Sequence, residues 1–285
     1  MMSSQILEAL SLGFSPEELE AAFSLHLSRW REERKSVEEP SAVTREKGST
    51  ERTIFIVGSN DLALDMLVSK LKEKDPDTVV VLTHAGSLGG LIALYENRAH
   101  VAGIHLLDEE TGEYNYPYLK RLLPGRRMAV VNLAFRIQGL MYRKNNPKRI
   151  RGIEDVWRKD VTFINRQKGS GTRVLLDMEL HKHNIKPSDI QGYEREVDTH
   201  VAVARIVARG EADTGLGIEA AAYATDLDFL PLFREKYDLV IPMENYNTNF
   251  ISPIIDIVTS IDFKTAVVSM AGYDNSQTGN TQFVG

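Results

Sequence analysis

The stretch Asn165-Arg166-Gln167-Lys168-Gly169-Ser170-Gly171-Thr172-Arg173 decides the fold, because two segments of different periodicity meet there. The apolar run Val161 to Ile164 before it predicts a buried strand, and residues 174–180 after it carry apolar side chains at helical spacing. The order is strand, glycine turn, helix. The two glycines allow close backbone approach to a ligand, and the first N–H groups of the helix point toward it. The turn is therefore either an anion site or a tight connection in which Ser or Thr caps the helix.

Three other segments begin helices in a similar way. Residues 53–71 and 79–95 each give strand, turn and helix, and residues 198–209 give a turn and a helix. Small hydroxyl residues stand at all four helix starts: Ser59, Ser87, Ser170 or Thr172, and Thr199. Open α/β sheets bind ligands beyond the carboxyl ends of their strands, so these four turns can converge on one cleft.

Length and composition restrict the class of protein. The 285 residues, 42% of them hydrophobic, can form one large domain or two lobes. The absence of cysteine excludes disulfides, thiolate metal sites and cysteine nucleophiles. A net charge of −6 argues against a nucleic-acid binder as a whole. With no long apolar run and no secretory signal, we expect a cytoplasmic location and no membrane partner.

Residues 1–50 differ from the rest of the chain. Ser15-Pro16-Glu17-Glu18 predicts a helix start, and the helix extends to about Arg34 with the apolar members Leu19, Ala22, Phe23, Leu25, Leu27 and Trp30. Residues 36–50 have the composition of a linker. We expect this helix to serve packing or a homodimer. DNA binding is the less favoured alternative, because no second recognition helix is present.

The remaining chain alternates strands and helices up to about residue 238, which predicts an α/β fold with largely parallel sheets. Tyr114, Tyr116 and Tyr118 alternate, which favours an extended segment, and the chain after Gly272 reads as a polar, loose tail.

Eight segments in this order resemble a known family: residues 87–91, 102–107, 112–115, 136–139, 145–147, 165–173, 199–204 and 210–217. They resemble the type 2 periplasmic-binding-protein-like domain of cytoplasmic proteins, over roughly residues 51–275. That domain often follows a helix-turn-helix module or is fused to a molybdopterin-biosynthesis protein. It is similar to molybdate- and tungstate-binding proteins, so the resemblance implies a small anionic ligand, with molybdate or tungstate favoured.

The resemblance implies a fold and a site. The fold is a two-lobed α/β structure with mostly parallel sheets behind a short α-helical N-terminal segment, residues 1–50. Lobe one would comprise residues 51–140 plus 239–285, and lobe two residues 141–238. The ligand would lie between Ser59 and Ser87 of lobe one and Gly169, Ser170, Gly171, Thr172 and Thr199 of lobe two. Asn60, Arg166 and His200 lie in the same turns and complete the candidate set.

The arginines that flank the glycine turn bear on the ligand. If Arg166 or Arg173 faces the cleft, a carboxylate or phosphate bound bidentately is favoured over an anion held by neutral donors. Arg173 lies on the first helical turn, where pairing with Asp177 favours a structural role. The direction of Arg166 stays open.

The main hypothesis is a cytoplasmic sensor that closes two lobes on a small oxyanion. One alternative is a ligand-responsive DNA-binding regulator. Another is an enzyme acting on a phosphorylated or carboxylated small molecule, with His84, His200 or Asp198 as its base. We expect no catalytic residues, no cofactor and no metal site, because His181 and His183 form the only tightly spaced histidine pair.

Overall fold

The structure is a computed structural model that describes residues 52–285. The expected N-terminal helix, its homodimer contact and its DNA contact all lie outside the described residues. Within residues 52–285, no helix combines the length and hydropathy needed to cross a membrane.

Lobe one begins with parallel strands. Its first elements are β1 (Arg52–Gly58), α3 (Leu62–Lys74), β2 (Thr78–His84), α4 (Gly86–Tyr95) and β3 (Val101–Ile104). β1 pairs in parallel with both β2 and β3. Because alternate strand residues face the same side, Ile54, Ile56 and Val80 share one buried core with Leu64 and Leu67 of α3. The predicted strands and helices are confirmed here to within a few residues.

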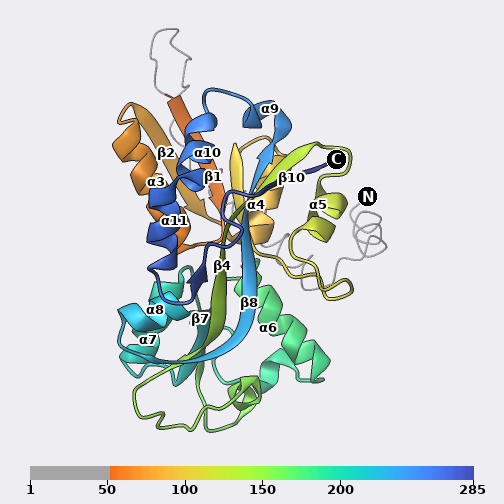
Figure 1. The fold of residues 1–285 in the computed structure, drawn as a ribbon. Helices are drawn as coiled ribbons and strands as arrows, with labels where there is room; N and C mark the ends of the chain where they lie inside the picture. Colours follow the sequence, from red (N-terminus) through yellow and green to blue (C-terminus); the bar gives the residue numbers. More distant parts are fainter. Residues whose placement is uncertain (1–51) are drawn as a thin grey trace, which may run out of the picture.

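Two long antiparallel strands run through both lobes (Figure 1). They are β4 (Met128–Tyr142) and β8 (Asp228–Pro242), each of 15 residues. The strand order is β2-β1-β3-β8-β4-β7-β5-β6, so the crossing pair lies in the middle of one continuous sheet. The flanking strands are parallel and the central ones antiparallel, which makes the sheet mixed.

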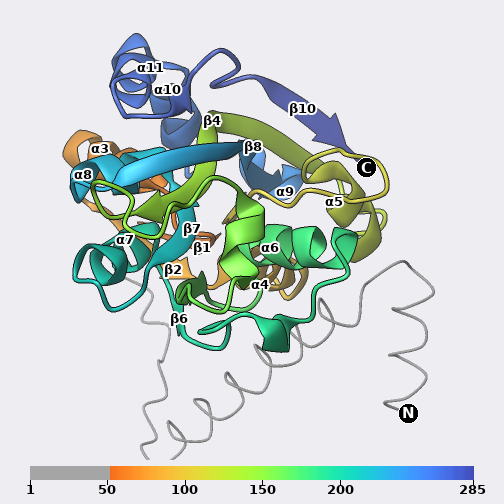
Figure 2. The ribbon, with the colours of Figure 1, turned by 90° about the horizontal axis from the view of Figure 1, so that it is seen from below.

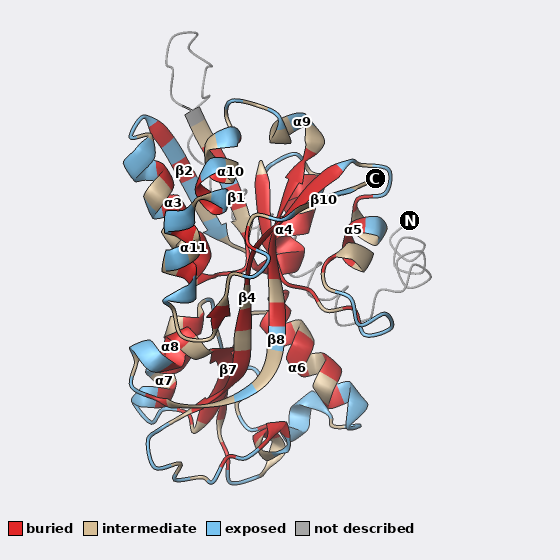
Figure 3. Cartoon of the chain, viewed as in Figure 1, coloured by how far each residue is buried: buried red, intermediate tan, exposed pale blue. Residues whose placement is uncertain are grey.

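Lobe two repeats the strand–helix arrangement. Its strands are β5 (Phe163–Arg166), β6 (Glu196–Val197) and β7 (Thr214–Ile218), and its α-helices are α6 (Gly171–Lys182), α7 (His200–Ala208) and α8 (Glu219–Ala224). Short 3-10 helices cover Ile153–Trp157 and Pro187–Asp189. Seen from below, α6 and α7 lie on different sides of β7 (Figure 2). Buried residues follow β4 and β7, while the outer helix faces are exposed (Figure 3).

The C-terminal region returns to lobe one. It contains α9 (Met243–Tyr246), α10 (Ser252–Thr259), α11 (Ile261–Val268), β9 (Tyr273–Asp274) and β10 (Thr281–Val284). The expectation of a loose tail was wrong, because β9 and β10 both pair with β4. Thr278 also anchors this tail by donating its hydroxyl to the Leu133 carbonyl at 2.9 Å. We propose the lobe boundaries given above, since β4 and β8 pass from one group of elements to the other near residues 138–140 and 233–238.

The aromatic segment after β3 is helical from Tyr116 on, whereas Tyr114 before it forms an antiparallel β-bridge with Leu107. Helix α5 (Tyr116–Leu122) has Pro117 in its first turn and buries Tyr118 and Leu119. Proline favours the start of a helix, because its ring fixes φ and the missing N–H is not needed there. The alternating tyrosines did not reveal this.

Candidate functional site

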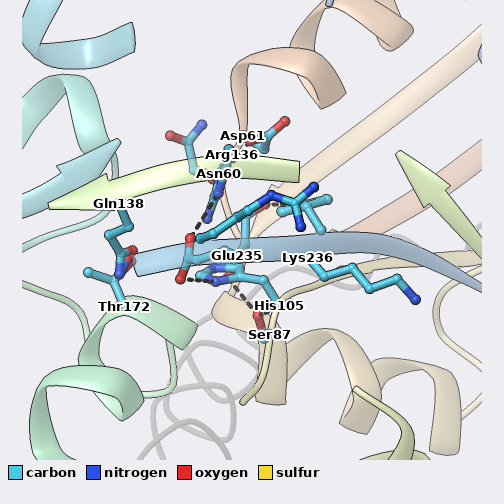
Figure 4. A network of polar contacts seen from close by, with 12 residues as sticks. Asn60, Asp61, Ser87, His105, Arg136, Gln138, Thr172, Glu235 and Lys236 are labelled. Carbon is cyan, nitrogen blue, oxygen red and sulfur yellow. Dashed lines mark hydrogen bonds and ion pairs between the residues drawn. The ribbon is translucent and has the colours of Figure 1, made fainter. Parts of the chain in front are cut away.

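A buried ionic network lies where β4 and β8 cross between the lobes (Figure 4). Arg136 of β4 donates through Nε to Glu235 Oε2 of β8 at 3.0 Å and through Nη1 to Asp61 Oδ2 at 2.6 Å. Glu235 Oε1 lies 3.0 Å from Nδ1 of His105, so this carboxylate holds two partners. All four side chains are buried. We call the region around this network the junction.

The directions of the pKa shifts in the network indicate which groups carry charge. Burial disfavours the Glu235 carboxylate, but His105 and Arg136 outweigh it and hold its pKa below the ordinary value. Burial lowers the pKa of His105, although Glu235 opposes this shift. The arrangement is therefore a neutral imidazole that donates to an ionised carboxylate. Burial also opposes the charge of Arg136, yet Glu235 and Asp61 raise its pKa.

Asp61 joins the network to the start of α3. Its Oδ1 accepts the N–H groups of Ala63 and Leu64, which caps the helix, and its Oδ2 accepts the hydroxyl of Tyr273 at 2.6 Å. One carboxylate thus fixes Arg136, α3 and the C-terminal segment together.

The two predicted serines of lobe one are in contact. The hydroxyl oxygens of Ser59 and Ser87 lie 2.9 Å apart, and Ser87 also accepts the N–H of His105 at 3.1 Å. Both side chains are buried. The single bond between them uses one hydroxyl hydrogen and leaves the other available.

The glycine turn of lobe two contacts lobe one. Ser170 is the N-cap of α6 and accepts the N–H of Arg173 at 3.2 Å. Gly169, at φ +80°, accepts the N–H of Leu88 in α4 at 3.3 Å. A Cβ added at Gly86 would lie 2.5 Å from the Gly169 carbonyl. The two helix N-termini therefore meet, and the lobes are in contact at this point.

Of the other predicted site residues, one caps a helix and the rest lie at the junction. Thr199 is half-buried and caps α7 by accepting the N–H of Ala202. His200 is buried, and its backbone N–H donates across the lobes to Asn60 Oδ1 at 3.4 Å. Thr172 donates to Gln138 Oε1 on β4 at 2.9 Å, and Gly171 packs so closely that an added Cβ would lie 2.5 Å from the His105 ring.

Arg166 is buried at the junction and has no ion pair with a carboxylate among residues 52–285. It donates through Nε to Gln167 Oε1 at 3.1 Å and through Nη2 to the Asp198 carbonyl at 2.8 Å. Burial, and then repulsion from Arg136, lowers its pKa to about 9. An uncompensated buried guanidinium is costly unless an anion pairs with it.

Arg173 has the structural role expected for it. Its Nε lies 3.4 Å from Asp177, and its Nη1 lies 3.8 Å from Glu196. The guanidinium carbon lies 3.8 Å from the ring centroid of Tyr193, which is a cation–π contact.

Several buried nitrogens at the junction have no hydrogen-bond partner among the described residues. They are Arg136 Nη2, Gln138 Nε2, Arg166 Nη1 and both ring nitrogens of His200. Burial, then Arg166 and Arg136, lowers the pKa of His200 well below its ordinary value, so its ring is neutral and carries one N–H. The set therefore presents roughly seven N–H hydrogens, from Arg136 and Gln138 on the crossing strand β4 and from Arg166 and His200 of lobe two.

Most residues of this network were not predicted from the sequence. Arg136 and Gln138 precede the predicted crossing, where lining a cleft and bracing a hinge could not be separated. Glu235 lies between Arg234 and Lys236, and the buried member of such a charged run cannot be chosen without the partner strand. His105 gave no signal beyond its place after an apolar strand.

The comparisons with known proteins agree with this architecture. The sequence pattern of the PBP superfamily domain matches residues 68–259. The chain belongs to this family. The protein YvgK of Bacillus subtilis (strain 168) is 37% identical over 228 residues, which cover 80% of this chain and 73% of that protein.

Solved structures share the fold. A phosphate ABC transporter substrate-binding protein with bound phosphate from Clostridium perfringens has a TM-score of 0.57 at 17% identity, covering 76% of this chain and 97% of that one. The tungstate ABC transporter protein of Geobacter sulfurreducens has a TM-score of 0.55 at 15% identity, covering 76% and 98%. The regulatory domain of a LysR family regulator from Neisseria meningitidis gives 0.52 at 14%, covering 78% and 97%. The family and fold together mark residues 52–285 as a small-ligand-binding domain.

Proposed function

We propose that this protein is a cytoplasmic sensor that closes its two lobes on a small oxyanion at the junction. The observation that carries the proposal is the set of unpartnered buried N–H donors on Arg136, Gln138, Arg166 and His200. Buried donors are normally satisfied, and each one left without a partner costs about 1–3 kcal/mol. An anion bound among them would recover that cost for all of them at once.

The geometry favours a tetrahedral oxyanion over a carboxylate. Neither arginine offers a bidentate fork, because Arg166 has committed Nε and Nη2, and Arg136 has committed Nε and Nη1. Each presents a single Nη group. A carboxylate has about four lone-pair sites for the roughly seven N–H hydrogens, whereas four oxygens offer about eight on the same count.

Within that class, molybdate and tungstate are the favoured ligands, with phosphate and sulfate as the nearest competitors. The resemblance to molybdate- and tungstate-binding proteins and the fold shared with a tungstate transporter protein support this order. The phosphate bound in the Clostridium perfringens protein supports the wider class. Closure would report the ligand to a partner, a role that the shared fold of a LysR-type regulatory domain supports.

An enzyme acting on a phosphorylated small molecule is the second candidate. One observation favours it: His200 is a buried imidazole whose ring nitrogens have no partner within the described part of the chain, and its lowered pKa keeps it neutral, so one nitrogen can accept a proton. Asp198 does not complete a dyad, because its side chain is exposed and its carbonyl is taken by Arg166. Turnover of a phosphate ester that His200→Asn abolishes, without a loss of affinity, would favour the enzyme over the sensor.

Calorimetric titration tests the main proposal. The panel is molybdate, tungstate, sulfate, phosphate and succinate, measured on the wild type, on Gln138→Leu and on the exposed control Gln277→Leu. We expect saturable binding of at least one tetrahedral oxyanion, weakened about tenfold or more by Gln138→Leu and unchanged by Gln277→Leu. No binding of any tetrahedral oxyanion would contradict the function. Binding that Gln138→Leu leaves unchanged would contradict the site.

A further inference from the structure

One face of the first two strands is apolar and exposed. It consists of Phe55 on β1 and of Val79 and Val81 on β2, whose exposed fractions are 39%, 42% and 39%. Phe55 pairs directly with Val81, and Val79 lies two residues along the same strand, so the three side chains are neighbours on one side of the sheet. We call them the β1–β2 apolar face.

The described helices of lobe one leave this face partly exposed, although the ring of Phe55 also contacts that of His100, with 5.7 Å between the centroids. Helix α3 covers the opposite side, where Ile54, Ile56 and Val80 are buried. Helix α4 covers only the end of β1 on the apolar side, where a Cβ added at Gly90 would lie 2.8 Å from the Val57 carbonyl. The face therefore begins where α4 ends and extends to β2, the outermost strand of the sheet on that side.

An edge strand of this composition normally needs cover. Natural proteins protect edge strands with charged residues, proline, bulges or an overlying helix or loop. β2 reads Thr78-Val79-Val80-Val81-Leu82-Thr83-His84 and contains no lysine, arginine, aspartate, glutamate or proline. The face is therefore built to be covered.

We propose that residues 15–34 of this same chain pack as a helix on the β1–β2 apolar face. Leu19, Phe23, Leu27 and Trp30 are spaced by three or four residues and form one apolar stripe of the helix that the sequence predicts there. A helix of that length spans about 30 Å, and a seven-residue strand spans about 23 Å, so the stripe can cover the face from end to end.

The linker between the predicted helix and β1 supports packing of the helix on its own chain rather than on a second copy. The chain enters the sheet at Arg52 on β1, the strand that carries Phe55. The linker of residues 36–50 reaches up to about 50 Å when extended, which is ample for the helix to fold back onto its own sheet. A short tether holds the stripe at an effective concentration in the millimolar range, which a second copy in dilute solution does not match. The N-terminal helix then belongs to lobe one and moves with it.

Disulfide cross-linking tests whether the helix packs on this face. The chain has no native cysteine, so only the introduced cysteines can form a disulfide. Phe23→Cys and Leu27→Cys are each paired with Val79→Cys and with Val81→Cys in the full chain, then oxidised and mapped by mass spectrometry. A disulfide forms only where the Cα atoms come within about 7 Å. The control pairs Phe23→Cys with Tyr223→Cys, an 80% exposed residue of lobe two.

We expect an intrachain disulfide in at least one of the four test pairs and none in the control. Interchain disulfides in the test pairs would overturn the proposal in favour of a second copy. The absence of any disulfide in all four pairs would overturn it as well.

Fluorescence provides a second readout that needs no disulfide geometry. Trp30 and Trp157 are the only tryptophans, so Trp157→Phe leaves Trp30 as the sole reporter. In that background we expect Val79→Asp with Val81→Asp to shift Trp30 emission to longer wavelength, while Tyr223→Asp leaves it unchanged. Unchanged emission in the Val79→Asp, Val81→Asp variant would overturn the proposal. The β1–β2 apolar face contains none of the junction residues. We therefore expect oxyanion titration of these variants to match the wild type, so that this proposal and the proposed function can fail independently.

Discussion

Arg136 and Glu235 stand directly opposite each other on the two crossing strands, and the guanidinium Nε donates to the carboxylate at 3.0 Å. The pair is completely buried. It ties β4 to β8 at the point where the chain passes between the lobes. It also orients the guanidinium so that, among residues 52–285, only its Nη2 has no hydrogen-bond partner. A structural ion pair thus determines which atom of Arg136 can reach a ligand.

The first prediction concerns this pair. Glu235→Gln removes one of the two carboxylate charges that compensate Arg136, the other being that of Asp61. It also leaves one acceptor oxygen where Arg136 and His105 now bond to one oxygen each, so we expect the free energy of unfolding to fall by about 3–5 kcal/mol. Urea denaturation at neutral pH measures the loss. Asp274→Asn is the control, because Asp274 pairs with Arg234 at 2.7 Å with both side chains largely exposed. Such a surface pair contributes about 0–1 kcal/mol. Equal losses in the two variants would show that the buried pair at the junction stabilises the fold no more than the surface pair does.

The second prediction separates the two arginines of the glycine turn. Arg166→Met removes a buried charge that no carboxylate compensates, so the ligand-free protein should be as stable as the wild type or more stable. Oxyanion affinity should nevertheless fall about tenfold to a hundredfold, since a hydrogen bond to a charged group contributes about 1.5–3 kcal/mol. Calorimetry and urea denaturation of the same variant test both statements.

Arg173→Met should show the reverse behaviour. It breaks the ion pair with Asp177 and the stack on Tyr193, so stability should fall, while affinity falls less than in Arg166→Met. If Arg173→Met weakened binding more than Arg166→Met, the assignment of Arg166 as the ligand-facing arginine would be wrong.

Local patterns predicted the fold well. Alternation and turn chemistry located β1, β2, β5 and the helices that follow them to within a few residues, because each element is defined by neighbours in sequence. The antiparallel pairing of β4 with β8 could not be predicted in the same way. The two strands are about 100 residues apart, and nothing in either segment specifies which residues pair across them. The C-terminal strands β9 and β10 were missed because they have only two and four residues, too few to show an alternating pattern, and they pair with β4 through backbone groups.

The candidate site shows the same division. The turns containing Ser59, Ser87 and Gly169 were predicted from local glycine and hydroxyl patterns, and the structure brings them to the junction. What each hydroxyl does there was not predictable. Ser170 caps its own helix and Thr172 orients Gln138, and both roles depend on partners chosen by tertiary packing. The orientation of Arg166 depends likewise on the Asp198 carbonyl, which the sequence places 32 residues away.

The third prediction is a pH dependence of stability. Burial, with Arg166 and Arg136, lowers the pKa of His200 well below its ordinary value of 6.5. The unfolded chain therefore binds more protons than the folded one below pH 6.5, and stability is lost as the pH falls through that range. The slope for one histidine reaches about 1.4 kcal/mol per pH unit. Glu235, with its lowered pKa, adds a loss at more acid pH in the same direction.

Urea denaturation at pH 7.5, 6.5 and 5.5 measures this slope. We expect His200→Asn to reduce the slope without abolishing it, because burial also lowers the pKa of His105 and of His100. His181→Asn, which alters an exposed side chain, should leave the slope as in the wild type. An unchanged slope in His200→Asn would mean that this ring does not control the acid response.

The last prediction tests the contact between the lobes. Gly86 has φ +78°, and an added Cβ would meet the Gly169 carbonyl of lobe two at 2.5 Å. Gly112 has φ +68°, but an added Cβ there would meet nothing within 4 Å. Both alanine variants carry similar backbone strain, of about 1–2 kcal/mol, so they differ mainly in the contact between the lobes.

We expect Gly86→Ala to hold the lobes apart. In saturating oxyanion its radius of gyration, measured by small-angle X-ray scattering, should exceed that of Gly112→Ala. Its affinity should be at least about tenfold lower, because Arg166 and His200 of lobe two no longer converge with Arg136 and Gln138 of β4. The strain common to both variants should lower their stability equally. If Gly86→Ala bound the anion as tightly as Gly112→Ala, the contact of Gly169 with α4 would be unnecessary for binding.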